Sequence, residues 1–172
     1  AYGVYLGIRT AVQHRLGSDS MRGLRVAIQG LGNVGFHLAG LLAADGAYVL
    51  GADPLTRNAR RAADAHGVGL VSPDLLLAAE VDLLAPCAMG SVLDTPVIDR
   101  LRAGIVAGAA NNQLASGSSA GELLDRGILY CPDFLINAGG IIDVYHQRLG
   151  SSSEAMRAHV QHIEANLKEI LY

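Results

Sequence analysis

The sequence predicts an α/β fold: a doubly wound parallel sheet with further helices flanking it at the N-terminal and C-terminal ends. Short apolar runs of strand length alternate along the chain with segments whose apolar residues recur at helical spacing. Three glycines stand between the first such run and the helical segment that follows it. Regular alternation of strands and helices favours a parallel sheet that is covered by helices on both faces.

The chain is predicted to open with a helix and a loop over residues 1–20. Apolar residues recur there at every fourth position, and a cluster of Gly, Ser and Asp ends the pattern. A strand at 24–29, a helix after Gly35 and a strand at 47–52 come next. Residues 24–53 therefore form one strand–helix–strand unit.

The same alternation continues along the chain. Further helices are predicted at 55–66, 73–79, 95–102 and 119–126, and further strands at 69–71, 81–85, 104–108 and 127–130. Two last helices are predicted at 135–149 and 153–171. We therefore divide the chain into an N-terminal helix and loop (1–20), a sheet domain (21–150) and a C-terminal helix (151–172).

The composition argues against several classes of protein. The chain has 172 residues, a formal net charge of -3 and a pI near 6.0, without a basic run, so no nucleic acid partner is expected. No apolar run approaches the roughly 18 to 20 residues that cross a bilayer, so no membrane partner is expected either. Cys87 and Cys131 stand far apart in the sequence, which indicates free thiols and a cytoplasmic location.

Gly30, Gly32 and Gly35 form the pattern G-x-G-x-x-G. In Rossmann-type folds the first glycine permits a tight turn, the second lets the backbone approach a pyrophosphate, and the third packs the helix closely on the strand. The N–H groups near Asn33 and Val34 would then face the phosphates. A purely structural turn is the alternative, but the place between strand and helix favours a dinucleotide site.

Asp53 closes the second predicted strand. It follows the glycines at close to the spacing of about 20 residues at which a carboxylate accepts hydrogen bonds from the adenosine ribose. A carboxylate also repels a ribose 2′-phosphate, so NAD is the expected cofactor. Arg57 is close enough in sequence to leave a role for NADP open.

Three segments follow the later strands, at 86–90, 109–113 and 132–140. Ligands of open α/β sheets bind beyond the carboxyl ends of the strands, so these segments should converge beside the nicotinamide. Adjacent carboxamides at Asn111 and Asn112 suit hydrogen bonds to the cofactor or to a substrate carboxylate.

Each of these residues has a second interpretation. Cys87 is either a nucleophile or, in the reading we favour, a small buried residue beside the cofactor, because no histidine stands at a recognisable spacing. Asn111 and Asn112 also suit a turn with left-handed backbone. Asn137, which precedes two glycines, either binds a ligand or marks the start of a helix.

The six histidines do not form a metal-ligand pattern. His159 and His162 stand three residues apart on a predicted helix, without a third ligand in view. Glu164 and Lys168 form an i,i+4 pair on the same helix, which indicates a solvated face. No metal site is predicted.

Five motifs together resemble one family. They are AYGVYLG at 1–7, GLRVAIQGLGNVG at 23–35, APCAMG at 85–90, AGAANNQL at 107–114 and PDFLINAGGIIDV at 132–144. The chain resembles the cofactor domain of the Glu/Leu/Phe/Val amino-acid dehydrogenases, and their leucine dehydrogenase branch, with its valine and phenylalanine relatives, in particular.

This resemblance implies an NAD-dependent oxidoreductase that reversibly deaminates an apolar L-amino acid, branched-chain and leucine-like, to a 2-oxo acid and ammonia. Asn111 and Leu135 would contact this small-molecule substrate. The implied cofactor ligands are Gly30, Leu31, Gly32, Asn33, Val34, Gly35 and Phe36 for the pyrophosphate, Asp53 for the ribose, Cys87 and Ala88 for the middle of the cofactor, and Ala110, Asn111, Asn112 and Asn137 for the nicotinamide side.

The departures from the family are as informative as the matches. Catalytic groups of the family belong to a first domain that this chain does not contain, so no catalytic residue is assigned, and the chain alone is expected to be inactive. The missing catalytic domain of the same polypeptide is an expected partner, and the parent enzyme is expected to be a homo-oligomer. Gly35 stands where relatives often have alanine, and both residues are small enough for the site.

Two other functions fit parts of the pattern. A non-catalytic NAD-sensing domain shares the glycines and Asp53 but has little use for polar groups aimed at the nicotinamide. A hydroxy-acid dehydrogenase would need a histidine near the nicotinamide, for which His146 is the candidate. The apolar helix that begins at Leu135 would be partly uncovered in this chain, which predicts some self-association.

Overall fold

The structure is a computed structural model that describes residues 1–88 and 90–171. Met89, in the predicted segment at 86–90, and Tyr172, at the end of the predicted C-terminal helix, lie outside the described residues.

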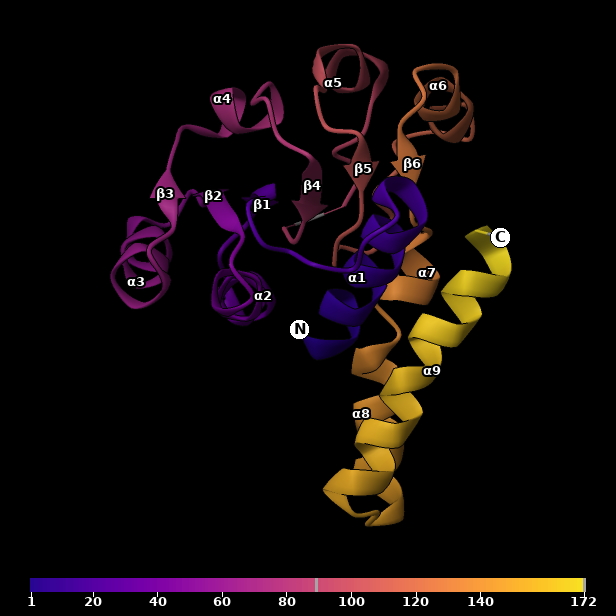
Figure 1. The fold of residues 1–172 in the computed structure, drawn as a ribbon. Helices are drawn as coiled ribbons and strands as arrows, with labels where there is room; N and C mark the ends of the chain where they lie inside the picture. The colour runs from indigo at the N-terminus through magenta and orange to yellow at the C-terminus, as the bar shows by residue number, and fades with distance from the viewer. Residues whose placement is uncertain (89, 172) are drawn as a thin grey trace.

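Six parallel strands form a sheet in the order β3-β2-β1-β4-β5-β6, which confirms the predicted doubly wound fold (Figure 1). The strands are β1 (Arg25–Gln29), β2 (Tyr48–Ala52), β3 (Gly69–Leu70), β4 (Leu83–Pro86), β5 (Ile105–Val106) and β6 (Leu129–Tyr130).

Helices cover both faces of this sheet. In Figure 1, α1, α2 and α3 lie on one side of the strands, and α4, α5 and α6 lie on the other. Their bounds are α1 (Tyr2–Leu16), α2 (Asn33–Ala44), α3 (Thr56–His66), α4 (Pro73–Leu77), α5 (Thr95–Arg100) and α6 (Ser119–Asp125).

The side chains of the central strands alternate between two cores. Val26 and Ile28 of β1 are buried in the core beneath α1 and α2, whereas Ala27 between them is buried in the core beneath α4, α5 and α6. Leu83 and Leu84 of β4 divide in the same way. Burial on both faces explains why these strands are continuous apolar runs in the sequence.

The strand register shows at which edge of the sheet the central strands end. Gln29, the last residue of β1, pairs with Ala52 of β2 and with Pro86 of β4, so these three strands end at one edge of the sheet. The direction of strand order reverses between β1 and β4, because β2 and β3 lie to one side and β5 and β6 to the other. Such a switch point opens a crevice at the carboxyl edge.

Residues 135–149 do not form the single helix that periodicity predicts. The chain forms a short helix α7 (Asp133–Ile136) and then α8 (Gly139–Leu149), with Asn137 at the end of α7. Two consecutive glycines at the start of α8 have low helix propensity, and apolar periodicity does not register an interruption of two residues.

The C-terminal helices form a hairpin that extends away from the sheet (Figure 1). The second helix, α9 (Ser153–Leu171), packs on both α1 and α8. A separate apolar cluster joins the three helices; its buried members are Leu6, Ile142, Val160 and Ile163. Across the described ranges, no helix is long and apolar enough to cross a lipid bilayer.

Candidate functional site

The glycine loop between β1 and α2 has little room for side chains. Gly30 has a φ of 92°, in the left-handed region, and a Cβ there would lie 2.8 Å from the Ala88 Cβ. Gly30 donates its N–H to the Ala52 carbonyl at 2.8 Å, which ties the loop to the end of β2. Gly32 differs, because a Cβ built there meets nothing within 4 Å. Its backbone therefore faces open space, as close approach by a ligand requires.

The space at Gly35 is smaller than the sequence predicted, because alanine was also expected to fit at this position. A Cβ at this position would lie 1.9 Å from the carbonyl oxygen of Gly30 and 3.4 Å from the Cys87 Cβ. Alanine therefore does not fit this loop unless the Gly30 carbonyl moves. Size alone suggested that either residue would fit, because a sequence does not show how closely the helix approaches the turn.

The N-terminus of α2 fits an anion such as a pyrophosphate. Gly32 occupies the N-cap position without a side-chain hydrogen bond, and the first turn contains no acidic residue. The first N–H groups of a helix lack partners within it and carry the positive end of the helix dipole. Asn33 is exposed and Val34 is half-buried at this end, so this helix end is compatible with the predicted pyrophosphate site, which stays a prediction.

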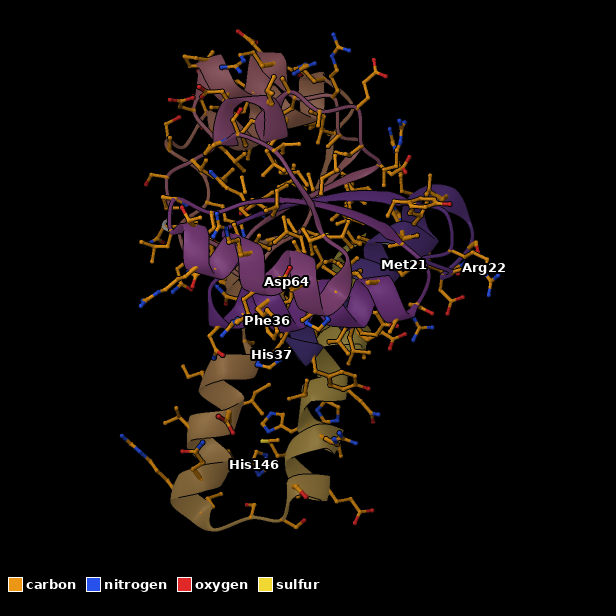
Figure 2. All side chains as sticks on the ribbon, turned by 90° about the vertical axis from the view of Figure 1, so that its left-hand side faces the viewer. Met21, Arg22, Phe36, His37, Asp64 and His146 are labelled. Carbon is orange, nitrogen blue, oxygen red and sulfur yellow. The ribbon has the colours of Figure 1, made fainter. Side chains whose placement is uncertain are left out.

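Phe36 lies behind this loop rather than in it. Its N–H donates to the Gly32 carbonyl at 2.9 Å, and its ring packs on α3, with the His66 ring centroid at 4.5 Å and the Arg61 guanidinium carbon 3.9 Å from the Phe36 centroid. Figure 2 shows Phe36 on the side of the molecule that carries α3. The ring of Phe36 joins α2 to α3, and the pyrophosphate contact of this residue stays a prediction.

Asp53 holds the loop from the end of β2. Its Oδ2 accepts the N–H of Leu31 at 2.8 Å, and its Oδ1 accepts the N–H of Leu55 at 2.8 Å and the Asn58 amide at 3.3 Å. The carboxylate is half-buried. It stands beside the glycine loop, where the sequence placed a ribose ligand, and it also fixes that loop.

The segment after β4 packs against the glycine loop. Ala88 is exposed and touches Gly30, and Cys87 is half-buried next to Gly35. Burial raises the pKa of the Cys87 thiol from its ordinary value of 9.0 to about 11, and a backbone hydrogen bond at Ala109 opposes this shift. A thiol with this pKa stays protonated at neutral pH, so Cys87 suits the role of a small neutral neighbour better than that of a nucleophile.

The segments after β5 and β6 meet through two carboxamides. The Asn137 Nδ2 donates to the Asn111 Oδ1 at 2.5 Å. Ala110 is buried and donates its N–H to the Pro86 carbonyl at 2.9 Å, and Asn112 has a left-handed φ of 51°. Asn112 therefore has the turn conformation that the sequence offered as one of its interpretations, whereas Asn111 and Asn137 form a polar pair.

A cavity of about 740 Å³ joins the start of α2 to this polar pair. Four of the predicted site residues line it, namely Asn33, Val34, Asn111 and Asn137. The other predicted residues are not part of this lining; they are Gly30, Leu31, Gly32, Gly35, Phe36, Asp53, Cys87, Ala88, Ala110, Asn112 and Leu135. Leu135 is half-buried against the core.

Sequence reasoning missed several residues of this region. Asp143 of α8 and Arg157 of α9 line the cavity, since the hairpin forms its far wall. Gln113 and Asp133 brace the loop after β5, and Gln113 is fully buried. The sequence placed Gln113 in the segment after the fifth strand but did not indicate its role, because its side-chain partners are backbone carbonyls.

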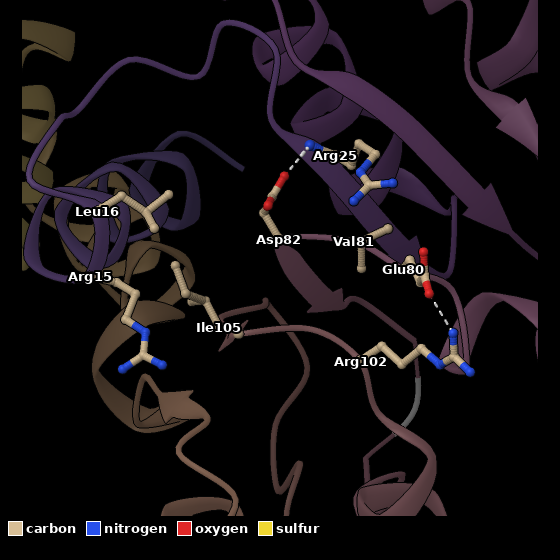
Figure 3. A pocket seen from close by; sticks show the side chains of 9 residues that line it. Arg15, Leu16, Arg25, Glu80, Val81, Asp82, Arg102 and Ile105 are labelled. Atoms are coloured by element: carbon tan, nitrogen blue, oxygen red, sulfur yellow. Dashed lines mark hydrogen bonds and ion pairs between the residues drawn. The ribbon is translucent and has the colours of Figure 1, made fainter.

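A second cavity, of about 400 Å³, opens at the opposite edge of the sheet (Figure 3). Arg15, Arg25 and Arg102 line it together with acidic residues. Arg102 pairs with Glu80 at 2.5 Å, and the Arg25 N–H donates to Asp82 at 2.7 Å. This cavity lies at the amino ends of β1, β4 and β5, away from the glycine loop, so it is not the predicted cofactor site.

The histidines of the C-terminal hairpin bond to each other rather than lining the site. Nε2 of His146 and Nδ1 of His159 lie 3.1 Å apart between α8 and α9, and Figure 2 shows His146 on the hairpin. His146 does not line the cavity. In the described part of the chain, no three His, Cys, Asp or Glu residues are grouped as a metal site would need.

A parallel sheet of this strand order, with a glycine loop after β1, defines the class of Rossmann-type α/β domains. Within this class, the sequence model of the glutamate/leucine/phenylalanine/valine dehydrogenase family matches residues 55–172. The chain belongs to this family.

Individual relatives agree with this assignment. Leucine dehydrogenase of Bacillus subtilis is 37% identical over 171 residues, and the match covers 99% of this chain and 47% of that protein. L-tryptophan dehydrogenase of Nostoc punctiforme is 40% identical over 169 residues, covering 98% and 48%. The crystal structure of L-tryptophan dehydrogenase from Nostoc punctiforme superposes with a TM-score of 0.96 at 39% identity, covering 99% and 52%.

The predicted resemblance to the leucine dehydrogenases is thus confirmed. The chain spans about half the length of the relatives it matches. These relatives are amino-acid dehydrogenases. They give no support to the two other functions considered, an NAD-sensing domain and a hydroxy-acid dehydrogenase.

Proposed function

We propose that this chain binds NAD along the carboxyl edge of its sheet and serves an enzyme that reversibly deaminates an apolar L-amino acid to a 2-oxo acid and ammonia. One observation carries the proposal. The uncapped N-terminus of α2 and the Asn111–Asn137 pair lie on one cavity of about 740 Å³. Cavities of roughly 300 to 1,000 Å³ hold cofactors and small ligands.

Each end of the cavity suits one half of the cofactor. The N–H groups near Asn33 and Val34 would hold the pyrophosphate, with the open backbone of Gly32 in contact with it. Asp53 would accept from the ribose, because each carboxylate oxygen has lone pairs beyond those that it gives to the loop. Cys87 and Ala88 would border the middle of the cofactor.

The Asn111–Asn137 pair would meet the nicotinamide side, with Ala110 and Asn112 beside it. The bound nicotinamide supplies the hydride-accepting carbon, and the chain's part is to orient it and to exclude water from one side. Asn111 would also contact the substrate carboxylate. Leu135 stays a proposed neighbour of the substrate side chain.

We further propose that this chain does not turn over substrate alone. The described lining of the cavity contains no histidine or lysine that would take a proton from a bound amino acid. Its one carboxylate, Asp143, accepts a hydrogen bond from Gln147 on the α8 wall. The chain spans about half of its relatives, and the general base would belong to a catalytic domain in the rest of the polypeptide. A cytoplasmic homo-oligomer remains the expected form of the whole enzyme.

The substrate proposal favours leucine and other branched-chain amino acids. Relatives named leucine dehydrogenase and valine dehydrogenase support it. Relatives of similar identity named L-tryptophan dehydrogenase make tryptophan the competitor to test.

The first experiment is a titration of this chain with NADH and with NADPH, followed by an NAD-reduction assay with leucine, valine, isoleucine, phenylalanine and tryptophan. The assay is run on this chain and on a longer polypeptide that carries it. We expect NADH to bind about tenfold more tightly than NADPH, turnover of branched-chain substrates by the longer polypeptide, and none by this chain. Deamination by this chain alone would refute the proposal that the catalytic groups belong to another domain. Absent NADH binding would refute the cofactor proposal.

A matched pair of variants tests the place of binding. Gly32 and Gly117 both have open space where a Cβ would lie, so alanine at either position should leave folding intact. Gly32→Ala should weaken NADH binding about tenfold or more, because the methyl group occupies the approach to the pyrophosphate. Gly117→Ala, in the exposed loop before α6, should leave binding unchanged. Equal affinities for both variants would place the cofactor elsewhere.

A further inference from the structure

A fully buried amide lies directly behind the loop that carries Asn111. The Gln113 Nε2 donates to the carbonyl of Gly108 and to the carbonyl of Ala110, each at 3.0 Å. The side chain is 0% exposed, and its Oε1 has no partner among the described residues. An amide nitrogen has two N–H groups, one for each carbonyl. Reversing the amide would set oxygen against oxygen, so this environment fixes its orientation.

The backbone of the same residue is also held by the segment that follows the neighbouring strand, β6. The backbone N–H of Gln113 donates to the Asp133 Oδ2 at 3.0 Å, and the Asp133 Oδ1 accepts the N–H of Phe134 at 2.7 Å. Asp133 begins α7, and its carbonyl accepts the N–H of Asn137 at 3.0 Å. One path of hydrogen bonds thus links the Gln113 backbone, through Asp133, to Asn137, which carries the second carboxamide.

The loop between these anchors has a conformation that needs support. Asn112 has a left-handed φ of 51°, a conformation that asparagine tolerates better than most residues but that glycine adopts more readily. A Cβ at Gly90 would lie 2.1 Å from the carbonyl oxygen of Asn111, so the segment after β4 closes tightly over this turn. The Ser91 N–H donates to the Asn112 carbonyl at 2.5 Å. The position of the Asn111 carboxamide therefore depends on the turn as a whole.

We infer that Gln113 is a positioning residue for the nicotinamide end of the site, acting through the Gly108 and Ala110 carbonyls to set the Asn111 carboxamide against Asn137. The inference rests on the proposed function, since it assumes that the Asn111–Asn137 pair meets the nicotinamide. Gln113 itself does not touch the cavity. Gln113 should affect the contacts with the nicotinamide and not those with the pyrophosphate and ribose, because the latter lie on the α2 and β2 side of the crevice.

The test compares NADH with ADP-ribose, which contains every part of NADH except the nicotinamide. Gln113→Met keeps an unbranched side chain of similar length but removes both donors. We expect this variant to bind NADH about tenfold more weakly, because the Asn111 carboxamide loses its position at the nicotinamide, and to bind ADP-ribose within roughly twofold of the unaltered chain. Gln161→Met, the same change at an exposed position of α9, should leave both affinities unchanged.

A second variant covers the case in which Gln113→Met does not fold. Asp133→Asn keeps the shape of the side chain but points an N–H group at one of its two backbone donors, and it should give the same selective loss to a smaller degree. Equal weakening of both ligands, or no change in either, would overturn the positioning role while the cofactor proposal stands. Failure of the unaltered chain to bind either ligand would refute the cofactor proposal and this inference together.

Discussion

Asp53 combines two tasks at one position. Its carboxylate accepts the Leu31 N–H from the glycine loop and the Leu55 N–H from the start of the next segment. It therefore fixes the loop on which the proposed pyrophosphate site depends, in addition to its proposed contact with the ribose. The spacing from the glycines predicted the second task but not the first, because a hydrogen bond to a backbone N–H leaves no mark in the sequence.

We expect Asp53→Asn to weaken NADH binding about tenfold, which corresponds to about 1.4 kcal/mol. The asparagine must point an N–H group at either Leu31 N–H or Leu55 N–H, and it loses the charge that hydrogen-bonds the ribose most strongly. The preference for NADH over NADPH should shrink, because the repulsion of a 2′-phosphate disappears. Calorimetric titration of both cofactors measures both effects.

Asp64→Asn is the matched control, since Asp64 is exposed on α3. It removes the same charge without a loop contact and should leave both affinities unchanged. An Asp53→Asn variant that binds NADH as tightly as the unaltered chain would remove Asp53 from the site.

The other residues of the site were predictable to different degrees. Asn111 and Asn137 follow parallel strands, whose carboxyl ends share an edge, so their approach was a consequence of the topology. Gln113 was not predictable, because it acts on backbone carbonyls that any sequence would provide. The crowding at Gly35 arises from a contact with another backbone carbonyl, and residue size gave no indication of it.

At the scale of elements, the sheet was predictable and the C-terminal helices were predictable only in part. Apolar periodicity located α9 within a residue of its ends but joined α7 to α8. The interruption places Asn137 beside Asn111 and starts α8 with two glycines. A Cβ on the first of them would lie 3.9 Å from the Gly3 Cα of α1. A helical repeat of apolar residues shows which face of a helix is buried. It does not show whether the helix is continuous.

The outer face of α8 supports the predicted self-association. Its exposed apolar residues recur at helical spacing; they are Ile141, Val144, Tyr145 and Leu149. Ile141 is 76% exposed and Leu149 is 62% exposed. Large exposed apolar patches tend to be buried against another molecule, and these residues share one side of α8.

We expect this chain to form dimers or larger species at high concentration, and the double substitution Ile141→Lys with Leu149→Lys to keep it monomeric. Light scattering over a concentration series measures the mass of the species directly. Leu124→Lys, at a 75% exposed position on α6, controls for the effect of an added charge and should not prevent association. A monodisperse monomer of the unaltered chain at high concentration would contradict the prediction.

At the scale of the whole molecule, several ionisable groups are buried in their neutral form. Burial raises the pKa of Cys131, fully buried in the core beneath α1 and α2, from 9.0 to about 12. Burial also raises the pKa of Tyr130 from 10.0 to about 12, with a further contribution from the charge of Asp133. Folding favours the protonated form of such groups, so the stability of the fold is linked to pH in the alkaline range.

The sign of this linkage follows from the direction of the shift. A thiol whose folded pKa exceeds its unfolded pKa contributes its full stabilisation below about pH 9, and loses it as pH rises from there towards 12. One such group lowers the free energy of unfolding by about 1.4 kcal/mol per pH unit within that window. We therefore expect urea unfolding under reducing conditions to give constant stability between about pH 7 and 8.5 and a steep decline above pH 9.

Cys131→Ala separates this linkage from general alkaline denaturation. At neutral pH the variant should be less stable than the unaltered chain by about 1 kcal/mol, because the lost sulfur leaves a small void in the core. Above pH 9 its stability should fall more gently, since the Cys131 thiol is no longer there to ionise on unfolding. A linkage of about 1.4 kcal/mol per pH unit exceeds the difference at neutral pH, so the two curves should cross at about pH 10. Parallel curves across the whole range would show that Cys131 does not carry the alkaline transition, and would shift the explanation to Tyr130 and Cys87.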